Sequence, residues 1–330
     1  MTCAGDRQED GFGRSPSHID AAPQAGQKAD IIRRLAALAL LFAIPACSLP
    51  PGNPPGVPVS SERPLRIASW NLEFLAEKDG TGCQPRDAAD YRAMRAIADS
   101  LDADVIAFQE AESERAAQRV FDPARYTIVM ETRAGDPTGT CGGRHPDQPF
   151  IRQAVGLAIR KGIAFERHPD VTGLMLGNPQ LRSGVDVTIR PRDDAPLRLL
   201  GVHLKSGCFS GTQDSACPVL LQQIPVLEAW IDAAAAGPTR FAVLGDWNRR
   251  LALAGDTVWT EIDDAEPANA DLRLADAGTP PRCDPRYDSF IDHIVLDRRA
   301  GTAMAGFSET PYPAGSKHYS DHCPVSVTLR

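Results

Sequence analysis

Apolar segments with the spacing of strands alternate with segments of helical spacing along most of the chain, and this alternation constrains the fold more than any other feature. Residues 87–102 and 217–236 have helical spacing, with Asp87 as the expected N-cap and Pro225 where we expect the second helix to kink or restart. The expected strands are residues 65–75, 104–110, 153–162, 184–190, 197–207, 240–248, 288–297 and 323–330. No internal repeat interrupts the series. We therefore predict one α/β domain rather than two.

Polar side chains follow nearly every predicted strand. Taken singly, each has an ordinary explanation, because Asn and Asp form turns after strands and a histidine is usually part of the core or the surface. However, α/β folds build their sites at strand ends, so a whole series of such residues predicts one shared site. The residues are Asn71, Glu110, His203, Asp246, Asn248, Asp292, His293, Asp321 and His322.

Oxygen ligands dominate this set. Carboxylates and amide oxygens are available from Glu110, Asp246, Asp292, Asp321, Asn71 and Asn248. Hard divalent cations prefer such ligands, together with waters and substrate phosphate. We therefore expect Mg²⁺, with Mn²⁺ or Ca²⁺ as alternatives, and not zinc.

The chain contains, in this order, "SWNLEF", "IAFQE", "GVHLKSG", "LGDWN", "SFIDHIVL" and "YSDHCPV". This series resembles the endonuclease/exonuclease/phosphatase superfamily of metal-dependent phosphoesterases, and its motifs span about residues 65–330. Each motif is weak alone, whereas the ordered set is specific. The resemblance implies an α/β four-layer sandwich, in which two mixed β-sheets pack face to face with helices outside and one cleft lies at the strand ends.

The resemblance also implies roles for individual residues. Glu110 resembles the principal metal carboxylate, with Asn71 beside it as a ligand of metal or phosphate. Asp246 and Asn248 resemble the pair that orients the attacking water and holds the phosphate. His203 matches a second histidine of the deoxyribonuclease-like members. A water needs a base, and either Asp246 or a histidine is placed to serve as one.

The last motif resembles the part of the family's site that contacts the scissile phosphate. His322 matches the histidine in that position. Asp321 matches its carboxylate partner and is also expected among the metal ligands, while Asp292 matches an acid that supports the site. Lys205 and Arg182 are further candidates for phosphate contact.

Charge limits the substrates of such a site. The formal net charge is −8, so a nucleic acid would be held by a local patch or through a metal, and tight non-specific duplex binding is not expected. Glu112 also stands where deoxyribonuclease-like members tend to carry a basic residue. We expect an exported, monomeric, metal-dependent phosphodiesterase, with a nuclease as one form. The alternatives are a phosphomonoesterase or sphingomyelinase-like phospholipid hydrolase of the same fold, or a non-catalytic binding module at the cell surface.

Residues 1–47 resemble a leader for export. Arg33 and Arg34 precede an apolar run at residues 35–46, which is shorter than the roughly 20 residues that a membrane span needs. The run ends at "IPAC", which resembles a bacterial lipobox with Cys47 as the lipidated residue. A simple cleaved signal or an uncleaved anchor is the alternative.

Residues 48–63 are rich in proline and lack apolar periodicity, so we expect an extended tether there. The catalytic domain is then residues 64–330. Together these features predict a membrane-anchored bacterial lipoprotein in the periplasm or at the cell surface.

Six of the eight cysteines lie beyond the leader, and an even number in an exported chain suggests disulfides. The C-x₂-C spacing of structural zinc sites is absent. The predicted pairs are Cys208–Cys217, which brackets a short polar loop, and, as the simplest pairing of the other four, Cys83–Cys141 and Cys283–Cys323.

Overall fold

The computed structural model describes residues 63–134, 138–143, 145–192, 194–313 and 315–330. The predicted leader, its Cys47 and almost all of the tether lie outside these residues. Within them, every helix is too short or too polar to cross a membrane.

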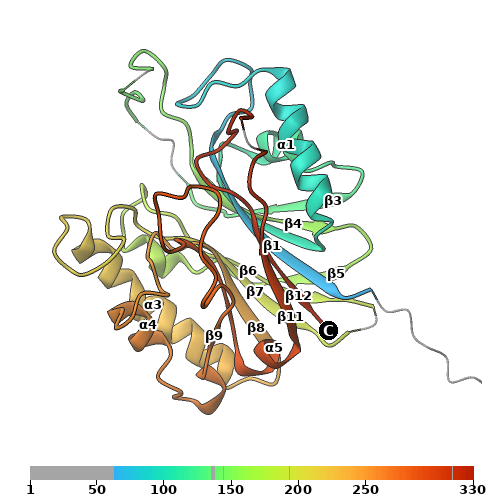
Figure 1. The fold of residues 1–330 in the computed structure, drawn as a ribbon, viewed down its shortest axis with the longest axis vertical. Helices are drawn as coiled ribbons and strands as arrows, with labels where there is room; N and C mark the ends of the chain where they lie inside the picture. The colour runs from blue at the N-terminus through green and yellow to red at the C-terminus, as the bar shows by residue number, and fades with distance from the viewer. Residues whose placement is uncertain (1–62, 135–137, 144, 193, 314) are drawn as a thin grey trace, which may run out of the picture. The chain divides into compact units, whose positions relative to one another are not determined.

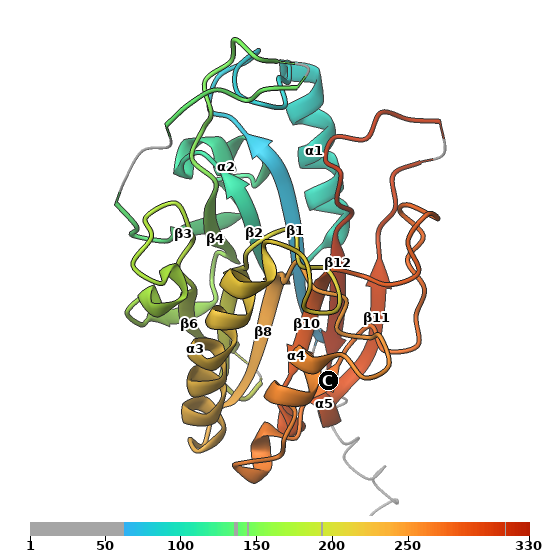
Figure 2. The ribbon, with the colours of Figure 1, turned by 90° about the vertical axis from the view of Figure 1, so that its left-hand side faces the viewer.

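The strands form two six-stranded sheets (Figures 1 and 2). The first has the order β11-β12-β1-β2-β4-β3 and consists of β1 (Leu65–Leu75), β2 (Val105–Ala111), β3 (Tyr126–Met130), β4 (Ala154–Arg160), β11 (Met304–Glu309) and β12 (Val325–Leu329). The second has the order β5-β6-β7-β8-β10-β9 and consists of β5 (Ala164–Arg167), β6 (Val185–Arg190), β7 (Leu197–His203), β8 (Arg240–Asp246), β9 (Arg273–Leu274) and β10 (Asp292–Leu296). Strands β1 and β2 pair in parallel, as do β7 and β8, while the neighbouring pairs are antiparallel, so both sheets are mixed.

The two sheets pack face to face through side chains that alternate along each strand. Ile67 of β1 and Leu157 of β4 share one buried cluster with Leu199 of β7 and Leu244 of β8. The strand period of two places Ala68 on the other face of β1, in a cluster with helical residues. Apolar surface from both sheets is thus removed from water, which is the main favourable contribution to folding.

Helices cover the outer faces of both sheets (Figure 2). Trp70 of β1 belongs to one buried cluster with residues of α1 and α2, and Phe241 of β8 belongs to another with residues of α3 and α4. These layers confirm the predicted four-layer α/β sandwich. The helices are α1 (Ala88–Leu101), α2 (Glu114–Val120), α3 (Cys217–Ala235), α4 (Thr257–Ile262) and α5 (Arg298–Ala303), with 3-10 turns η1 (Thr172–Met175) and η2 (Ala268–Ala270).

The predicted cap of α1 is present, and of the two outcomes expected at Pro225 of α3, a kink or a restart, the restart does not occur. The carboxylate of Asp87 accepts hydrogen bonds from the backbone N–H groups of Ala89, at 2.7 Å, and Asp90, at 2.9 Å. Helix α3 continues through Pro225 as one helix, so the helical path does not restart there. Burial of residues on both sides of this proline holds the helix against the second sheet.

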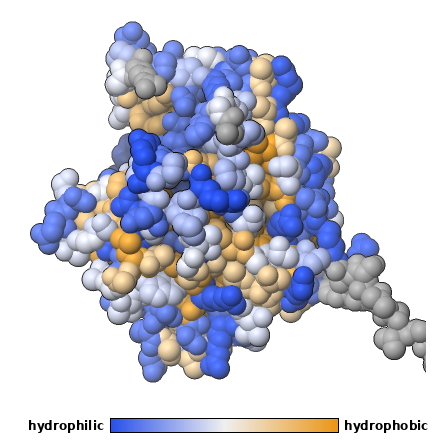
Figure 3. All heavy atoms as spheres, in the orientation of Figure 1, coloured by the Kyte–Doolittle hydropathy of each residue, from blue (hydrophilic) through white to orange (hydrophobic). Residues whose placement is uncertain are grey.

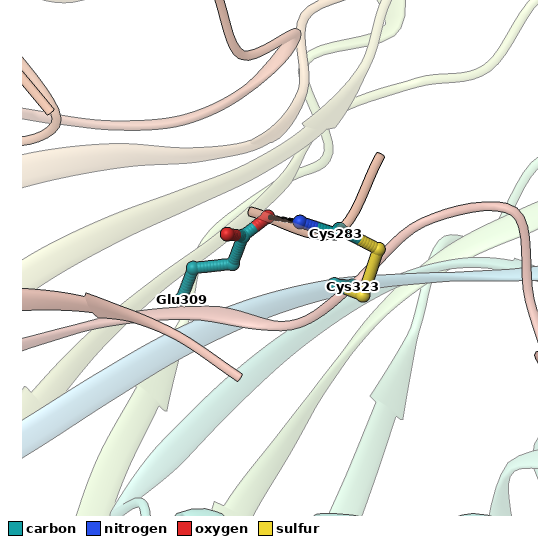
Figure 4. Close-up of side chains that lie close together, drawn as sticks. All are labelled: Cys283, Glu309 and Cys323. Carbon is teal, nitrogen blue, oxygen red and sulfur yellow. Dashed lines mark hydrogen bonds between the residues drawn. A yellow bond between two sulfur atoms is a disulfide. The ribbon is translucent and has the colours of Figure 1, made fainter. Parts of the chain in front are cut away.

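All three predicted disulfides are present: Cys83–Cys141, Cys208–Cys217 and Cys283–Cys323. Figure 4 shows the third beside Glu309, whose carboxylate accepts a hydrogen bond of 3.2 Å from the backbone N–H of Cys283. Because both sulfur atoms belong to the disulfide, this group offers no thiolate to a metal. It instead fastens the loop that precedes β12 to the segment before β10.

Candidate active site

Strands β1 and β2 bring Asn71 and Glu110 together. Asn71 lies beside Gln109 in the parallel register, and the pairing becomes irregular just beyond it, where Glu110 has a φ of +63°. Irregularities of this kind re-aim a side chain at the end of a strand. The Glu110 carboxylate accepts a hydrogen bond of 3.0 Å from the N–H of Phe74 and keeps its other oxygen near Asn71.

The amide of Asn71 bridges two carboxylates as a donor. Its Nδ2 lies 2.9 Å from Asp246 Oδ2 and 3.3 Å from Glu110 Oε1. Its Oδ1 accepts a hydrogen bond of 3.0 Å from the backbone N–H of Glu73. An amide oxygen has a second lone pair, so the role of Asn71 as a ligand of metal or phosphate stays a prediction.

The adjacent strands β7, β8 and β10 place three further site residues side by side across the sheet. His203 of β7 lies opposite Asp246 of β8 in the parallel register, and Asp292 of β10 lies opposite Asp246 in the antiparallel register. Gly245 allows this close approach, because a Cβ atom there would lie 2.0 Å from the carbonyl oxygen of Val202. This explains the glycine in "LGDWN".

Asp246 is the buried centre of the site, with its side chain 2% exposed. It accepts a hydrogen bond of 2.8 Å from the N–H of Asn248, which reaches this position with a left-handed φ of +50°. His203 Nε2 lies 3.4 Å from its Oδ2. Burial raises the pKa of Asp246 to about 7. The charge of His322 lowers this pKa and the charge of Asp292 raises it, but both effects are smaller than that of burial.

His322 pairs with Asp292, not with its chain neighbour Asp321. Its Nδ1 donates to Asp292 Oδ2 over 2.6 Å, whereas Asp321 Oδ1 lies 3.7 Å from its Nε2. The sequence analysis named the weaker of the two partners, because the Asp321 side chain is 67% exposed, whereas the register of β10 brings the buried Asp292 to Nδ1 of the ring. Burial lowers the pKa of His322, but the negative charges of Asp292 and Asp246 together raise it by more. The pKa of His322 therefore lies well above the usual range.

His203 has the opposite character. Burial, followed by the charges of Arg182 and His322, lowers its pKa well below the usual value, so its ring is neutral near pH 7. Its Nδ1 has no hydrogen-bond partner in the described part of the chain, and its Nε2 faces Asp246 and Glu110. The site therefore holds one charged and one neutral imidazole.

These side chains line one cleft of about 470 Å³, within the usual range for small-molecule sites. Seven of the residues predicted for the site contribute to its wall: Glu110, His203, Asp246, Asn248, Asp292, Asp321 and His322. The face drawn in Figure 3 is mostly hydrophilic, with hydrophobic residues scattered between hydrophilic ones.

Comparison with known protein families matches residues 68–322 to the Endonuclease/Exonuclease/phosphatase family. The chain belongs to this family. Its members are hydrolases that act on phosphoester bonds and generally depend on a divalent metal. A comparison with curated proteins found no match.

Solved structures of similar fold also belong to endonuclease/exonuclease/phosphatase proteins. A truncated TDP2 of Caenorhabditis elegans is 16% identical, with a TM-score of 0.53, and the match covers 80% of this chain and 97% of that one. The catalytic domain of human Nocturnin, which holds a sulfate anion, is 14% identical, with a TM-score of 0.51 and coverage of 81% and 94%. An endonuclease/exonuclease/phosphatase of Bacteroides vulgatus is 14% identical, with a TM-score of 0.53 and coverage of 82% and 99%. At these identities the likeness shows the fold alone.

The carboxylates of the cleft fit the divalent metal of endonuclease/exonuclease/phosphatase enzymes. Carboxylate oxygens of Asp246 and Asp292 lie within 4.8 Å of each other and of a ring nitrogen of His322, which as a charged imidazolium is a neighbour of the site and not a ligand. One oxygen of Asp292 is buried without a hydrogen-bond partner among the described residues. Glu110 and Asp321 add carboxylates on the same wall. Such a set of hard oxygen ligands suits Mg²⁺ or a similar ion.

Two predicted phosphate contacts lie outside the wall of the cleft. The guanidinium of Arg182 is buried and donates to the carbonyl oxygen of Leu204 over 3.0 Å. The Lys205 ammonium donates to the carbonyl oxygen of Ser206 over 2.6 Å. In this arrangement Arg182 supplies a buried positive charge that acts on Glu110 and Asp246, and the Lys205 ammonium is hydrogen-bonded to a neighbouring carbonyl oxygen.

Two further residues near the site, Glu73 and Arg86, were not predicted from the sequence. Glu73 accepts a hydrogen bond of 3.0 Å from the N–H of Asp321, and burial followed by the Asp321 charge raises its pKa to about 7. The buried guanidinium of Arg86 donates to the carbonyl oxygens of Leu72 and Tyr319, which ties the first motif to the last. Glu73 lies inside "SWNLEF", so its place in this motif could have marked it as a site residue. Arg86 does not directly follow a strand, so the rule that site residues follow strands could not find it.

Proposed function

We propose that this chain is an exported, divalent-metal-dependent phosphodiesterase that cleaves nucleic acid or a related diester by attack of water. The observation that carries the proposal is that Asp246 lies within 4 Å of two histidines, the neutral His203 and the charged His322. All three line one cleft together with further carboxylates. Such an arrangement can accept a proton at one point and stabilise negative charge at another.

Asp246 is the proposed base. A pKa of about 7 places it near the pH at which it can take a proton from water and later release it. Asn71 and the N–H of Asn248 donate to its two oxygens and so fix its orientation. The neutral ring of His203 lies 3.4 Å away and can accept or relay the proton.

His322 is the proposed stabiliser of the phosphate. Its Nδ1 is held by Asp292, so its Nε2–H is free to donate to a phosphoryl oxygen in the cleft. Its raised pKa keeps the imidazolium charged near neutral pH. Charge-assisted hydrogen bonds aimed at the developing negative charge usually lower the barrier of such a reaction more than any other single interaction does.

Glu110 and Asp321 are the residues that we propose to hold the metal, with Mg²⁺ as the first choice. A bound divalent cation would add Lewis-acid stabilisation of the phosphoryl oxygens. The N–H of Phe74 donates to the Glu110 carboxylate, and the N–H of Asp321 donates to Glu73, so the Glu110 side chain and the Asp321 backbone are fixed before any ion arrives.

The disulfides are the support for the proposal that the chain is exported. The three pairs suit an oxidising compartment, and cytosolic proteins rarely keep such bonds. Lipidation at Cys47, the membrane anchor and the monomeric state remain proposals, which palmitate labelling of a Cys47→Ser variant and light scattering would test.

The function is tested by a substrate panel assayed with EDTA and with added Mg²⁺. The panel contains bis-p-nitrophenyl phosphate, p-nitrophenyl phosphate, single-stranded and duplex DNA, RNA, and sphingomyelin vesicles. We expect metal-dependent hydrolysis of the diesters and little release from the monoester. Hydrolysis that EDTA leaves unchanged, or turnover confined to the monoester or to the vesicles, would contradict the proposal.

A further inference from the structure

Arg250 lies on the wall of the cleft, and its guanidinium is not paired with a carboxylate of the described residues. It comes two residues after Asn248 and lines the same cleft as Asp246 and His322. Its side chain has no ion pair and no hydrogen bond within the described part of the chain, and its Nε is buried without a partner. An arginine in such a position normally finds a carboxylate, so a free one facing a cleft suggests an anionic ligand.

Two aromatic rings flank this guanidinium. Its Cζ lies 5.7 Å from the ring centroid of Phe209 and 5.5 Å from that of Tyr287, both within cation–π distance. Tyr287 is 50% exposed, and among the described residues no other large hydrophobic side chain is exposed. Phe209 and Tyr287 both line the cleft, so an entering ligand meets two ring systems with a cation between them.

The neighbouring Arg249 shows that this arrangement is held rigidly. Its buried guanidinium donates to Asp256 over 2.7 Å and to the carbonyl oxygen of Gly211 over 2.6 Å. The N–H of Arg250 donates to the carbonyl oxygen of Phe209 over 2.9 Å, which joins the disulfide-closed loop of Phe209 to the end of β8. Arg249 therefore supports the loop, and Arg250 is left to face the cleft.

The other arginine of this wall is neutralised. Arg286 forms an ion pair with Asp284, and its Cζ lies 5.6 Å from the Tyr287 ring. Anion recognition at this end of the cleft thus falls to Arg250. A quaternary ammonium headgroup would be repelled by that charge, and the described surface exposes little besides Tyr287 for insertion into lipid, so a choline phospholipid fits poorly.

We propose that Arg250, Phe209 and Tyr287 form a subsite for single-stranded nucleic acid, in which the rings stack on a base and Arg250 binds a non-scissile phosphate. This inference rests on the proposed function. Stacking of this kind needs a base outside a duplex, and it tolerates any base because each has a π-face. The net charge of −8 also favours a short local contact over a long basic duplex-binding surface.

Three esters of the same leaving group test the subsite by turnover. Bis-p-nitrophenyl phosphate has no base, the p-nitrophenyl ester of thymidine 5′-phosphate adds the base, and its 3′-phosphorylated form adds a second phosphate. In the wild type, kcat/KM should rise with each addition. Arg250→Met should lower the ratio of the third ester to the second roughly 10- to 100-fold, and Tyr287→Ala should lower the ratio of the second to the first by roughly tenfold.

Two further variants sharpen this result. Arg250→Lys keeps the charge without the planar fork and should recover only part of the preference for the 3′-phosphate. Arg92→Met removes the same charge from the exposed face of α1, away from the cleft, and should leave both ratios unchanged. Equal losses on all three esters in Arg250→Met, or a wild type without preference for the 3′-phosphate, would overturn the subsite.

A binding measurement separates this inference from the proposed catalysis. Isothermal titration with thymidine 3′,5′-bisphosphate in EDTA reports on the subsite without turnover, and Arg250→Met should bind at least about tenfold more weakly than the wild type. Equal affinities would overturn the subsite even in an active enzyme, whereas weakened binding in a protein that hydrolyses none of the esters would overturn only the proposed function. Sphingomyelin vesicles complete the test, because hydrolysis of lipid that depends on Arg250, without a nucleotide preference, would assign the subsite to a lipid headgroup instead.

Discussion

Replacement of Asp292 by asparagine should impair catalysis by removing the charge that supports His322. The two side chains are joined over 2.6 Å and are only 9% and 13% exposed. A hydrogen bond to a charged group in such a position contributes about 1.5–3 kcal/mol. If that contribution is felt mainly in the transition state, kcat for bis-p-nitrophenyl phosphate should fall about 10- to 150-fold.

The pH profile gives this prediction a second readout. The neighbouring carboxylates, led by Asp292, raise the pKa of His322 against the effect of burial, so the imidazolium is present at low pH and is lost as the pH rises through that pKa. Asp292→Asn lowers the pKa, and the alkaline limb of the profile should move to lower pH. The matched variant Asp321→Asn should instead raise the Mg²⁺ concentration needed for half-maximal rate. Turnover of Asp292→Asn within twofold of the wild type, or a larger shift of the alkaline limb in Asp321→Asn, would refute the pairing.

The remaining predictions concern stability. Replacing Cys283 and Cys323 by serine opens a crosslink with a sequence separation of 40, and replacing Cys83 and Cys141 opens one with a separation of 58, so urea titration should show a loss of about 4 kcal/mol in each case. Activity should fall only in the first variant, whose disulfide adjoins the catalytic histidine; equal activities would contradict this. Burial and neighbouring acids raise the pKa of Glu228 to about 7, so its ionisation opposes folding above that pH and has no such effect below its ordinary pKa. Glu228→Gln should therefore raise the melting temperature much more at pH 8 than at pH 4, and the same change at both pH values would count against it.

The central elements of the fold could be predicted because their own residues show the pattern. Strands β1, β2 and β8 are almost entirely buried and carry long apolar segments. The short strands could not be predicted. β5 has four residues that are mostly exposed, and β9 has only two. These strands exist because a neighbouring strand supplies their hydrogen bonds, which no local pattern records.

The candidate site was predictable as a set of residues but not as a set of contacts. Strand ends gather at one edge, so Glu110, Asp246 and His322 could be placed together before their geometry was known. The partner of His322 could not, since adjacent residues in a loop point in different directions. The contact between Asp292 and His322 depends on the register of β10 with β8, which is a tertiary property.

The same limit applies to the charges around the site. Arg182 and Lys205 stand near the motifs in sequence, but the former is buried and the latter is hydrogen-bonded to a neighbouring carbonyl oxygen. Arg249 and Arg250 look alike in sequence and differ completely in environment. Only the fold separates a structural cation from one that faces the cleft.

The most direct test of the account is the rate of bis-p-nitrophenyl phosphate hydrolysis by the wild type, Asp246→Asn and His322→Ala, measured as Mg²⁺ is added to metal-free protein. We expect the wild-type rate to rise from near zero with Mg²⁺. Each variant should stay at least about 10²-fold slower at saturating metal, while its thermal unfolding changes little. A wild type that is fully active without metal, or either variant with near-wild-type turnover, would contradict it.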